Sequence, residues 1–434
     1  MIDLLRSKSA FSWVRNGVIA LAISGAYSIF LVVLRTPYLN KVIIGSEIFK
    51  SALVVHVNLS VLVWLVSISA ALWSCIITSR LLNNICSYFA LIGLILMGCA
   101  PLFGQNLPVM NNYIPMLENI IFIIGLSLFS VTILLFAICT VVDSYQFIVK
   151  DNGLRLIRFV SFSSACIYIL AWICFVWSFF KLQEVMNLIP IDIEFYYELL
   201  FWSGGHALQF LYTQNLMLIW IVLIATLTKK EASFNNIYFY LFILNFLSSL
   251  AVLPGHFHYI MDYEFKEYFT LQMKYLGGIA PLGMFALLLG EYMIHKKENL
   301  LSIDNTAGLA SFICSSILFM VGGIIGVLIS ETNVTIPAHY HGSIVGISIA
   351  YMGMVYYLLK IGSKLQIYIL TIGQFLHISG LALAGGYGVL RKTPGEDFTL
   401  SAKVAMGVMG GGGLIAIIGG LMFVYICAKH TQRN

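Results

Sequence analysis

Charged residues are scarce in this chain of 434 residues, because Asp, Glu, Lys and Arg together make up only 10% of it. Hydrophobic residues make up 60%, and the mean hydropathy is +0.93. A water-soluble domain of this size needs far more polar surface than this composition can provide. The composition therefore excludes a soluble globular protein and predicts a chain that folds in a lipid bilayer.

Several common motifs are also missing. The eight cysteines form no Cys-x-x-Cys and no Cys-x-x-Cys-His, which excludes covalent c-type haem and a zinc ribbon. There is no glycine-rich nucleotide motif, and no strands are expected for one to follow. No cleavable signal is expected, because residues 1–16 are polar and basic and the first apolar run is long enough to span a membrane.

Apolar runs of about 20 residues recur along the chain with short polar joints between them. They predict twelve membrane-spanning helices, at 17–34, 52–78, 83–104, 118–142, 157–180, 197–228, 235–262, 269–294, 306–330, 334–359, 365–389 and 400–428. No joint is long enough to separate two domains. We therefore predict one all-α membrane domain, a twelve-helix bundle over residues 1–434.

The cationic residues predict how the helices are oriented. With the N-terminus inside, 15 of the 24 Lys and Arg lie in the inner segments. Inner loops of membrane proteins carry an excess of Lys and Arg, so both termini are expected in the cytoplasm. The net charge of +5 follows this topology, and no nucleic-acid partner is expected.

Histidines are concentrated inside the predicted spans, and six of them lie at nearly one depth. These six are His56, His206, His256, His258, His339 and His341. At a rise of 1.5 Å per residue, they lie about 6–14 Å below the outer edge, on four separate helices. An ionisable side chain in hydrocarbon is costly and normally marks a functional site. The shared layer predicts a buried metal or haem centre, whereas His377, midway along its span, is interpreted as hydrogen-bonded to a neighbouring helix.

The sharpest local motif is His339-Tyr340-His341. Residues two apart on a helix point about 200° apart, so the two imidazoles face opposite sides. They cannot easily chelate one metal, but they can serve two redox centres that flank one helix, and haem iron commonly takes an axial imidazole. The motif predicts a two-haem geometry.

With these features the chain resembles the catalytic subunit I of the haem–copper oxidase superfamily, which has the nitric oxide reductases as relatives. The resemblance covers the whole length, with twelve spans, cytoplasmic termini and histidines on spans two, six, seven and ten. Trp202-Ser203-Gly204-Gly205-His206 is similar to the family's Trp-x-x-Gly-His. Tyr268-Phe269-Thr270 and Pro281-Leu282-Gly283 are similar to its Tyr-Phe-Thr and Pro-x-Gly.

The resemblance implies two haems, one low-spin with two histidine ligands and one high-spin, and a copper ion, which is an iron in nitric oxide reductases. The implied ligands are His56 and His341 for the low-spin haem, His339 for the high-spin haem, and His206, His256 and His258 for the second metal. Arg391-Lys392 occupies the place of the paired arginines that bind haem propionates.

Span seven departs from the family pattern of two adjacent histidines, because this chain reads His256-Phe257-His258. On a regular helix these two rings would diverge. Pro254 and Gly255 make a regular helix doubtful here, since proline removes a donor and glycine loosens the backbone. In a kinked or extended segment both imidazoles could converge on one metal.

A second departure concerns the tyrosine that many oxidases carry four residues after the span-six histidine. This chain has Phe210 there, whereas nitric oxide reductases tend to have glutamate. Tyr212 and Tyr259 are the candidates for the redox tyrosine. Polar residues below His206 (Gln209, Thr213, Gln214 and Asn215) could order water but form no acidic proton path, so proton pumping is unsupported.

The resemblance implies a respiratory terminal oxidase of the bacterial inner membrane that reduces O2 to water. The electron donor would be a partner, either a cupredoxin-type subunit II or a c-type cytochrome, because this chain has no copper–thiolate site and no c-type haem. The alternative in the same fold is a subunit of the nitric oxide reductase type. A more distant alternative is a haem-free transporter or metal-assembly protein, although the internal repeat of many transporters is missing here.

Overall fold

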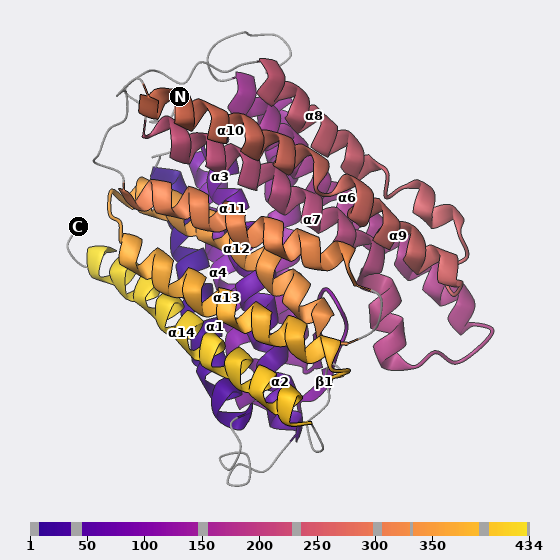
Figure 1. Cartoon of the computed structure of the whole chain (residues 1–434). Coiled ribbons are helices and arrows are strands. Elements are labelled where there is room, and N and C mark those ends of the chain that lie inside the picture. The colour runs from indigo at the N-terminus through magenta and orange to yellow at the C-terminus, as the bar shows by residue number, and fades with distance from the viewer. Residues whose placement is uncertain are drawn as a thin grey trace. The chain divides into compact units, whose positions relative to one another are not determined.

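The computed structural model describes residues 8–35, 46–145, 155–227, 236–297, 306–329, 333–389 and 399–431, nearly all of them helical (Figure 1). In chain order the elements are α1 (Lys8–Arg35), α2 (Ser46–Val57), η2 (Asn58–Val63), α3 (Trp64–Trp73), α4 (Arg80–Cys99), η3 (Ala100–Leu102), β1 (Leu107–Val109), β2 (Met116–Glu118), α5 (Ile120–Ser144), α6 (Arg155–Met186), α7 (Ile193–Ala225), α8 (Asn236–Leu250), η5 (Pro254–Phe257), α9 (Tyr263–Leu276), α10 (Ile279–Lys297), α11 (Thr306–Val327), α12 (Thr335–Leu359), α13 (Lys364–Gly386) and α14 (Leu400–Thr431).

Twelve helical spans of the described residues are long and apolar enough to cross a membrane, which confirms the predicted number. The chain is therefore a multi-pass membrane protein. The first span starts at Ser9, earlier than predicted, and Ala10, Trp13 and Val14 in this added part are buried.

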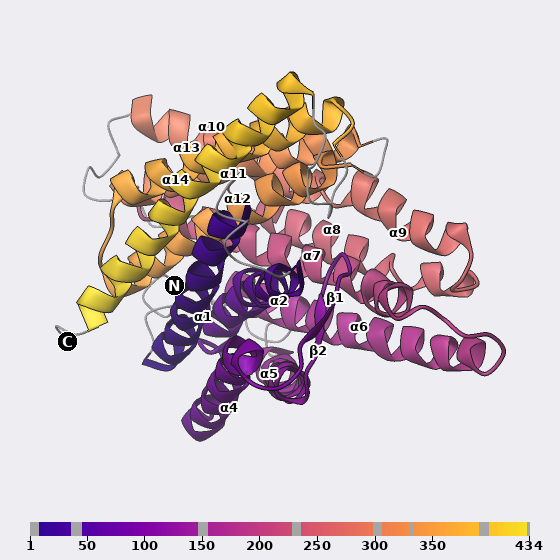
Figure 2. The same cartoon turned by 90° about the horizontal axis from the view of Figure 1, so that it is seen from below.

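The expectation that the chain has no strands is wrong. β1 and β2 form a short antiparallel hairpin in which Leu107 pairs with Glu118 and Val109 with Met116. The turn is closed by Asn111, whose Oδ1 accepts from the backbone N–H groups of Tyr113 (3.1 Å) and Ile114 (2.9 Å). Figure 2 shows the two strands beside α2 and α5, which they contact.

The chain divides into two compact units. The first comprises Met1–Tyr27, Gly45–Leu218 and Ser233–Met284, and the second comprises Ser28–Ile44, Ile219–Ala232 and Phe285–Asn434. In the first unit, α4 packs on α5, α5 on α6, and α6 on α8. Gly93 and Gly125 let α4 and α5 meet at backbone distance, since a Cβ on Gly93 would lie 2.7 Å from the Gly125 carbonyl oxygen.

The second unit is built on two tightly packed helix pairs, α11 with α12 and α13 with α14, and the second pair lies side by side in Figure 1. Glycines explain the close approach of α13 and α14. A Cβ on Gly412 would lie 2.4 Å from the backbone nitrogen of His377, and one on Gly380 would lie 2.4 Å from that of Met409. Of the glycine run 410–413, Gly412 therefore serves helix packing as predicted, whereas a Cβ on Gly410 or Gly411 would meet no atom within 4 Å.

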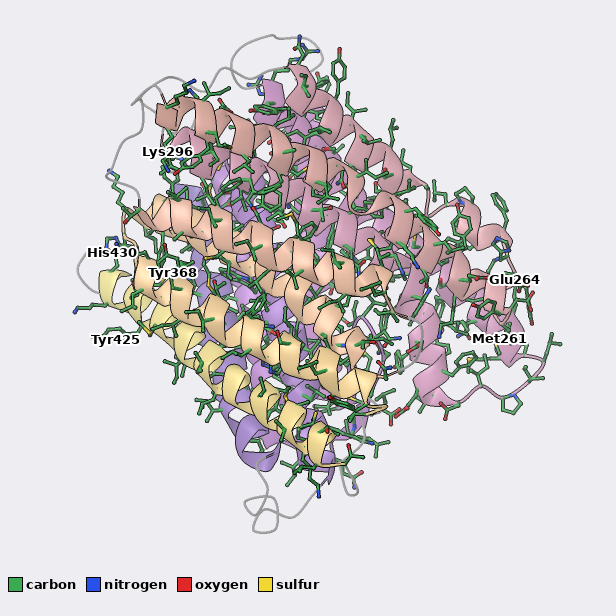
Figure 3. The ribbon with its side chains drawn as sticks, in the orientation of Figure 1. Met261, Glu264, Lys296, Tyr368, Tyr425 and His430 are labelled. Atoms are coloured by element: carbon green, nitrogen blue, oxygen red, sulfur yellow. The ribbon has the colours of Figure 1, made fainter. Side chains whose placement is uncertain are left out.

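One end of the second unit gathers polar and aromatic side chains. Lys296, Tyr368, Tyr425 and His430 all lie at this end (Figure 3). Lys429 extends over the Tyr425 ring, with its Nζ 5.8 Å from the ring centroid. Basic and aromatic residues are typical of a membrane interface, and this end is the one that the sequence places in the cytoplasm. The orientation itself stays a prediction.

Candidate haem and metal site

His206 lies on α7 and is almost fully buried, with 3% of its surface exposed. Its ring Nδ1 lies 2.7 Å from the carbonyl oxygen of Trp202, one helical turn earlier. A carbonyl accepts only from a protonated nitrogen, so this contact places the proton on Nδ1 and the lone pair on Nε2. This is the tautomer that a metal-binding histidine with a backbone partner adopts.

Each of the two glycines before His206 makes room for a different neighbour. A Cβ on Gly204 would lie 2.2 Å from the Phe175 ring and 2.7 Å from the Ala171 carbonyl oxygen, so Gly204 admits α6. A Cβ on Gly205 would lie 2.2 Å from Cγ of Tyr113, so Gly205 admits the hairpin. The Gly-Gly pair of the Trp-Ser-Gly-Gly-His motif therefore fits α7 between two neighbours.

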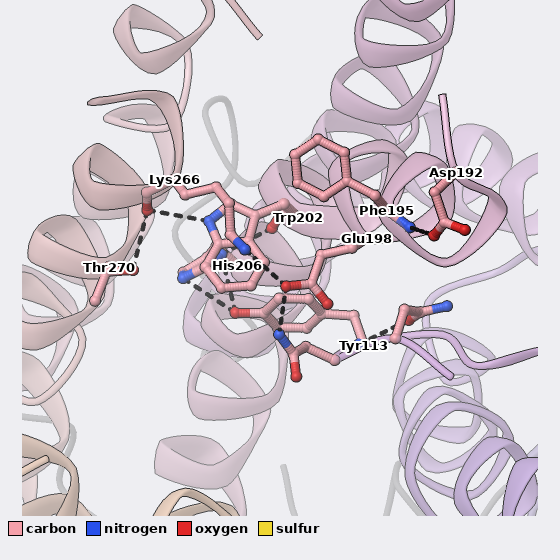
Figure 4. Close-up of polar contacts among 10 residues, drawn as sticks. Tyr113, Asp192, Phe195, Glu198, Trp202, His206, Lys266 and Thr270 are labelled. Carbon is pink, nitrogen blue, oxygen red and sulfur yellow. Dashed lines mark hydrogen bonds and ion pairs between the residues drawn. The ribbon is translucent and has the colours of Figure 1, made fainter. Parts of the chain in front are cut away.

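Tyr113, at the tip of the hairpin, reaches His206. Its hydroxyl oxygen lies 3.0 Å from each of the two ring nitrogens of His206 (Figure 4). Burial, and to a lesser extent the Glu198 carboxylate, raises the pKa of the Tyr113 phenol well above its ordinary value. The hydroxyl is therefore protonated at neutral pH and, in the absence of a metal on His206, can donate to the Nε2 lone pair.

Tyr113 was not predicted from the sequence because it lies in a loop between two spans. The signal that could have pointed to it is the Asn111-Asn112 pair just before it, since asparagine side chains favour tight turns. A tight turn in an outer loop brings an aromatic side chain back toward the helices, at the layer where the histidines were predicted.

A polar cluster surrounds Tyr113 and joins α7 to α9 (Figure 4). Lys266 pairs with Glu198 at 2.7 Å, and its Nζ lies 4.4 Å from the centroid of the Trp202 ring. The Trp202 indole N–H donates to the Lys266 carbonyl oxygen at 3.1 Å. Asn112 of the hairpin donates to Glu198 at 3.0 Å. The cluster thus holds the hairpin, α7 and α9 together around His206.

The helix of span seven ends before its histidines. α8 ends at Leu250, a turn follows, and Pro254–Phe257 form a short 3₁₀ helix. His258 is extended, with φ −71° and ψ 151°. The predicted loss of regular helix at Pro254 and Gly255 is therefore confirmed.

His256 and His258 have different surroundings. The His256 ring is 1% exposed and stacks on Trp177, with centroids 4.6 Å apart and planes 9° apart. Neither of its ring nitrogens has a hydrogen-bond partner among the described residues. The His258 ring is half-buried and lies against Tyr268, with centroids 5.7 Å apart.

Phe269 connects His206 with His256, because its ring centroid lies 5.8 Å from the first and 5.7 Å from the second. In the part of the chain that the structure describes, no three His, Cys, Asp or Glu side chains form a metal-ligating group. Of the predicted redox tyrosines, Tyr212 is buried within α7 and Tyr259 is 52% exposed. Arg391 and Lys392 lie outside the described residues.

His56 lies at the end of α2, directly before a π-helical segment, Asn58–Val63. Its Nδ1 lies 2.9 Å from the Ser24 hydroxyl and 3.1 Å from the Ser24 carbonyl oxygen on α1. Asn58 donates to the carbonyl oxygens of Val54 (2.9 Å) and Pro115 (2.7 Å), which ties the π-helical segment to the hairpin. Such π-helical bulges often occur at functional sites.

His339 and His341 face different neighbours, as the helical period predicts. The Nδ1 of His339 lies 2.7 Å from the Gly322 carbonyl oxygen, and a Cβ on Gly326 would lie 2.4 Å from this Nδ1. The small residues of α11 therefore form the groove that holds the His339 ring. His341 instead meets His377 of α13, with ring centroids 4.8 Å apart.

His377 is hydrogen-bonded to a neighbouring helix, as interpreted from the sequence. Its Nδ1 lies 2.9 Å from the Met409 carbonyl oxygen on α14. Gln374, one turn earlier on α13, donates to the His341 carbonyl oxygen at 3.3 Å. These two side chains fix α13 against α12 and α14 around the His341 ring.

The chemistry of the donors suits haem iron and copper, for which neutral imidazole is a usual ligand, although His206, His256 and His258 do not converge as a three-ligand group in the described structure. His56, His206 and His339 each direct Nδ1 at a backbone carbonyl, and this leaves Nε2 as the ligating nitrogen. The imidazole of His256 is buried with both nitrogens unpaired in the described chain, which is unfavourable without a further partner.

Known proteins are similar to this chain in sequence and in fold. The family described as cytochrome c and quinol oxidase polypeptide I matches residues 9–422. The chain is 44% identical to an uncharacterized protein, RP382, of Rickettsia prowazekii (strain Madrid E), covering 97% of this chain and 95% of the relative. It is 24% identical to an uncharacterized protein of Aquifex aeolicus (strain VF5), covering 84% and 86%.

The fold is similar to that of a heme-copper terminal oxidase dimer solved by cryo-EM, with a TM-score of 0.75 and 15% identity over 96% of this chain and 83% of that one. The chain belongs to the cytochrome c and quinol oxidase polypeptide I family, that is, to the haem–copper oxidase subunit I superfamily. The predicted family and the twelve-helix fold are confirmed. Membership makes the chain a membrane oxidoreductase of electron transport, in a family whose members generally bind haems and copper.

Proposed function

We propose that this chain is the haem- and copper-binding catalytic subunit of a respiratory terminal oxidase of the bacterial inner membrane, with O2 as its substrate and water as its product. The observation that carries the proposal is the tautomer shared by His56, His206 and His339, each with Nδ1 directed at a backbone carbonyl. A ligand must keep Nε2 unprotonated for a metal, and the Nδ1 contacts of these three histidines do so. His377 makes the same kind of contact, so His56, His206 and His339 are set apart from it by their positions in the family pattern.

The ligand assignments follow the family pattern. His56 and His341 are assigned to a low-spin haem, His339 to a high-spin haem, and His206, His256 and His258 to copper. When bound, these groups would supply the electron transfer and the reduction of O2. Arg391 and Lys392 are assigned to the haem propionates. We assign both termini to the cytoplasm, residues 1–434 to one functional domain, and electron supply to a partner, either a cupredoxin-type subunit II or a c-type cytochrome.

The residues around His206 and His256 have two tasks in this proposal. Trp177, Phe265 and Phe269 enclose the His256 ring and exclude water from it. Tyr113 keeps a protonated hydroxyl 3.0 Å from the His206 ring, where it can hold or move a proton. Phe210, at the position of the usual tyrosine, is fully buried and has no such group. We therefore assign the tyrosine role to Tyr113 ahead of Tyr212 and Tyr259.

Nitric oxide reduction is the second candidate, and Phe210 favours it because the tyrosine of many oxidases is missing there. Measuring which gas is consumed, O2 or nitric oxide, distinguishes the two functions. The purified complex, supplied with a reductant, is expected to consume O2 in a cyanide-sensitive reaction and to consume nitric oxide slowly. Rapid nitric oxide consumption without O2 uptake would contradict the oxidase assignment and support the second candidate.

A further inference from the structure

Lys181, near the end of α6, contacts the main chain of both span-seven histidines. Its ammonium group donates to the carbonyl oxygen of His256 and, at 3.0 Å, to that of His258. Trp177 lies one turn earlier on the same face of α6 and stacks on the His256 ring. One face of α6 therefore holds both the backbone and a side chain of this segment.

The segment needs such partners because it has left the helix. Carbonyl oxygens in the last turn of α8 and in the segment after it lack the regular α-helical donor four residues on, and a buried carbonyl without a partner is costly. α9 supplies donors on one side, where Gln272 donates to the Ser248 carbonyl oxygen at 2.8 Å and Tyr268 to that of Ala251 at 2.9 Å. Lys181 supplies the donors for the two histidines from α6.

Gly255 allows the segment to pack directly against α9. A Cβ on Gly255 would lie 2.6 Å from both the Phe269 and the Tyr268 rings. The backbone is therefore held between the aromatic rings of α9 and the ammonium group of Lys181. A lysine ammonium has three N–H donors and can serve two carbonyls at once, and such charge-assisted bonds are stronger than neutral ones.

We propose that Lys181 is a positioning residue of the second-metal site, which fixes the peptide groups of His256 and His258 and thereby the directions of their imidazoles. This inference rests on the proposed function, since it requires that these histidines bind a metal. It also accounts for the His-x-His departure from the family pattern: the chain replaces a helical pair of adjacent histidines by an irregular segment, and a lysine holds that segment.

The test compares Lys181→Met, Lys181→Arg and, as a matched control, Lys274→Met, which makes the same change at an exposed lysine of α9. Copper(I) is titrated into each copper-depleted, haem-loaded protein, and the haem content is measured by optical absorption. We expect Lys181→Met to bind copper about 10- to 100-fold more weakly, the usual effect of losing a group that orients a ligand. Its haem content should stay at the wild-type level. Lys181→Arg should recover most of the affinity, because a guanidinium also offers several donors.

Wild-type copper affinity in Lys181→Met would overturn the inference. Loss of copper and both haems together would also overturn it, because it would show a general structural role. A wild-type protein that binds haem but no second metal would refute the copper assignment itself, so the two failures are distinguishable.

Discussion

The metal-free protein should become no less stable when His256 is replaced by leucine. Burying an imidazole nitrogen without a hydrogen-bond partner costs about 1–3 kcal/mol, and both nitrogens of His256 lack one in the described chain. The stack on Trp177 returns about 0.5–1.5 kcal/mol. Leucine keeps apolar contact with the aromatic rings and has no polar atom to desolvate. His256→Leu should therefore raise the free energy of unfolding by zero to about 2 kcal/mol.

The same substitution at His206 is expected to have the opposite sign. His206 has partners in the Trp202 carbonyl and the Tyr113 hydroxyl, and leucine leaves the buried Tyr113 hydroxyl without this partner. His206→Leu should lower the free energy of unfolding of the metal-free protein by about 1–3 kcal/mol. Both variants should lose the second metal.

The assay is unfolding of detergent-solubilised, copper-depleted protein, followed by far-ultraviolet circular dichroism against denaturant, with copper content measured in parallel on loaded samples. A His256→Leu variant that is several kcal/mol less stable than the wild type, or that retains copper, would refute the reasoning. Equal destabilisation of the two variants would do so as well.

Three further predictions concern the hairpin. Tyr113→Phe should lower turnover on the order of 10²-fold, with haem content unchanged. The control Tyr263→Phe, at an exposed tyrosine, should leave both turnover and haem content unchanged. Unaltered turnover in Tyr113→Phe would show that Tyr113 is not part of the site. The pKa of Tyr113 is raised in the folded state, so its contribution to the free energy of unfolding is complete below pH about 10 and is lost as the pH rises above that. Chemical unfolding of Tyr113→Phe should therefore show a smaller loss of stability at alkaline pH than the wild type. Gly205→Ala should cost about 1–3 kcal/mol by overpacking against Tyr113, whereas Gly290→Ala, where a Cβ meets no atom within 4 Å, should cost nothing in the same unfolding assay.

The elements that follow from local sequence were predicted correctly. Hydropathy predicts the membrane spans because a run of about 20 apolar residues is the length that a helix needs to cross the hydrocarbon core of a bilayer. The helical period correctly predicted that the His339 and His341 rings point in different directions, since His339 contacts α11 and His341 contacts α13. Pro254 gave the break in span seven, since proline cannot donate to the preceding turn.

The features that depend on distant partners were not predictable in this way. Three-residue strands are too short to show an alternating pattern, so the hairpin and Tyr113 were missed. Lys181 contacts a carbonyl 75 residues away in sequence, and nothing in the sequence around it marks that contact. Asn58, the first residue of the π-helical segment after His56, donates to the Pro115 carbonyl oxygen, which is again a tertiary contact.

The central claim is that the layer of histidines binds two haems beside a second metal. A reduced-minus-oxidised optical spectrum of the purified, folded protein, with iron and copper measured on the same sample, tests it most directly. The account predicts the bands of both a low-spin and a high-spin haem, with copper present. A folded preparation without any haem signal would contradict it and would favour the haem-free transporter or metal-assembly alternative.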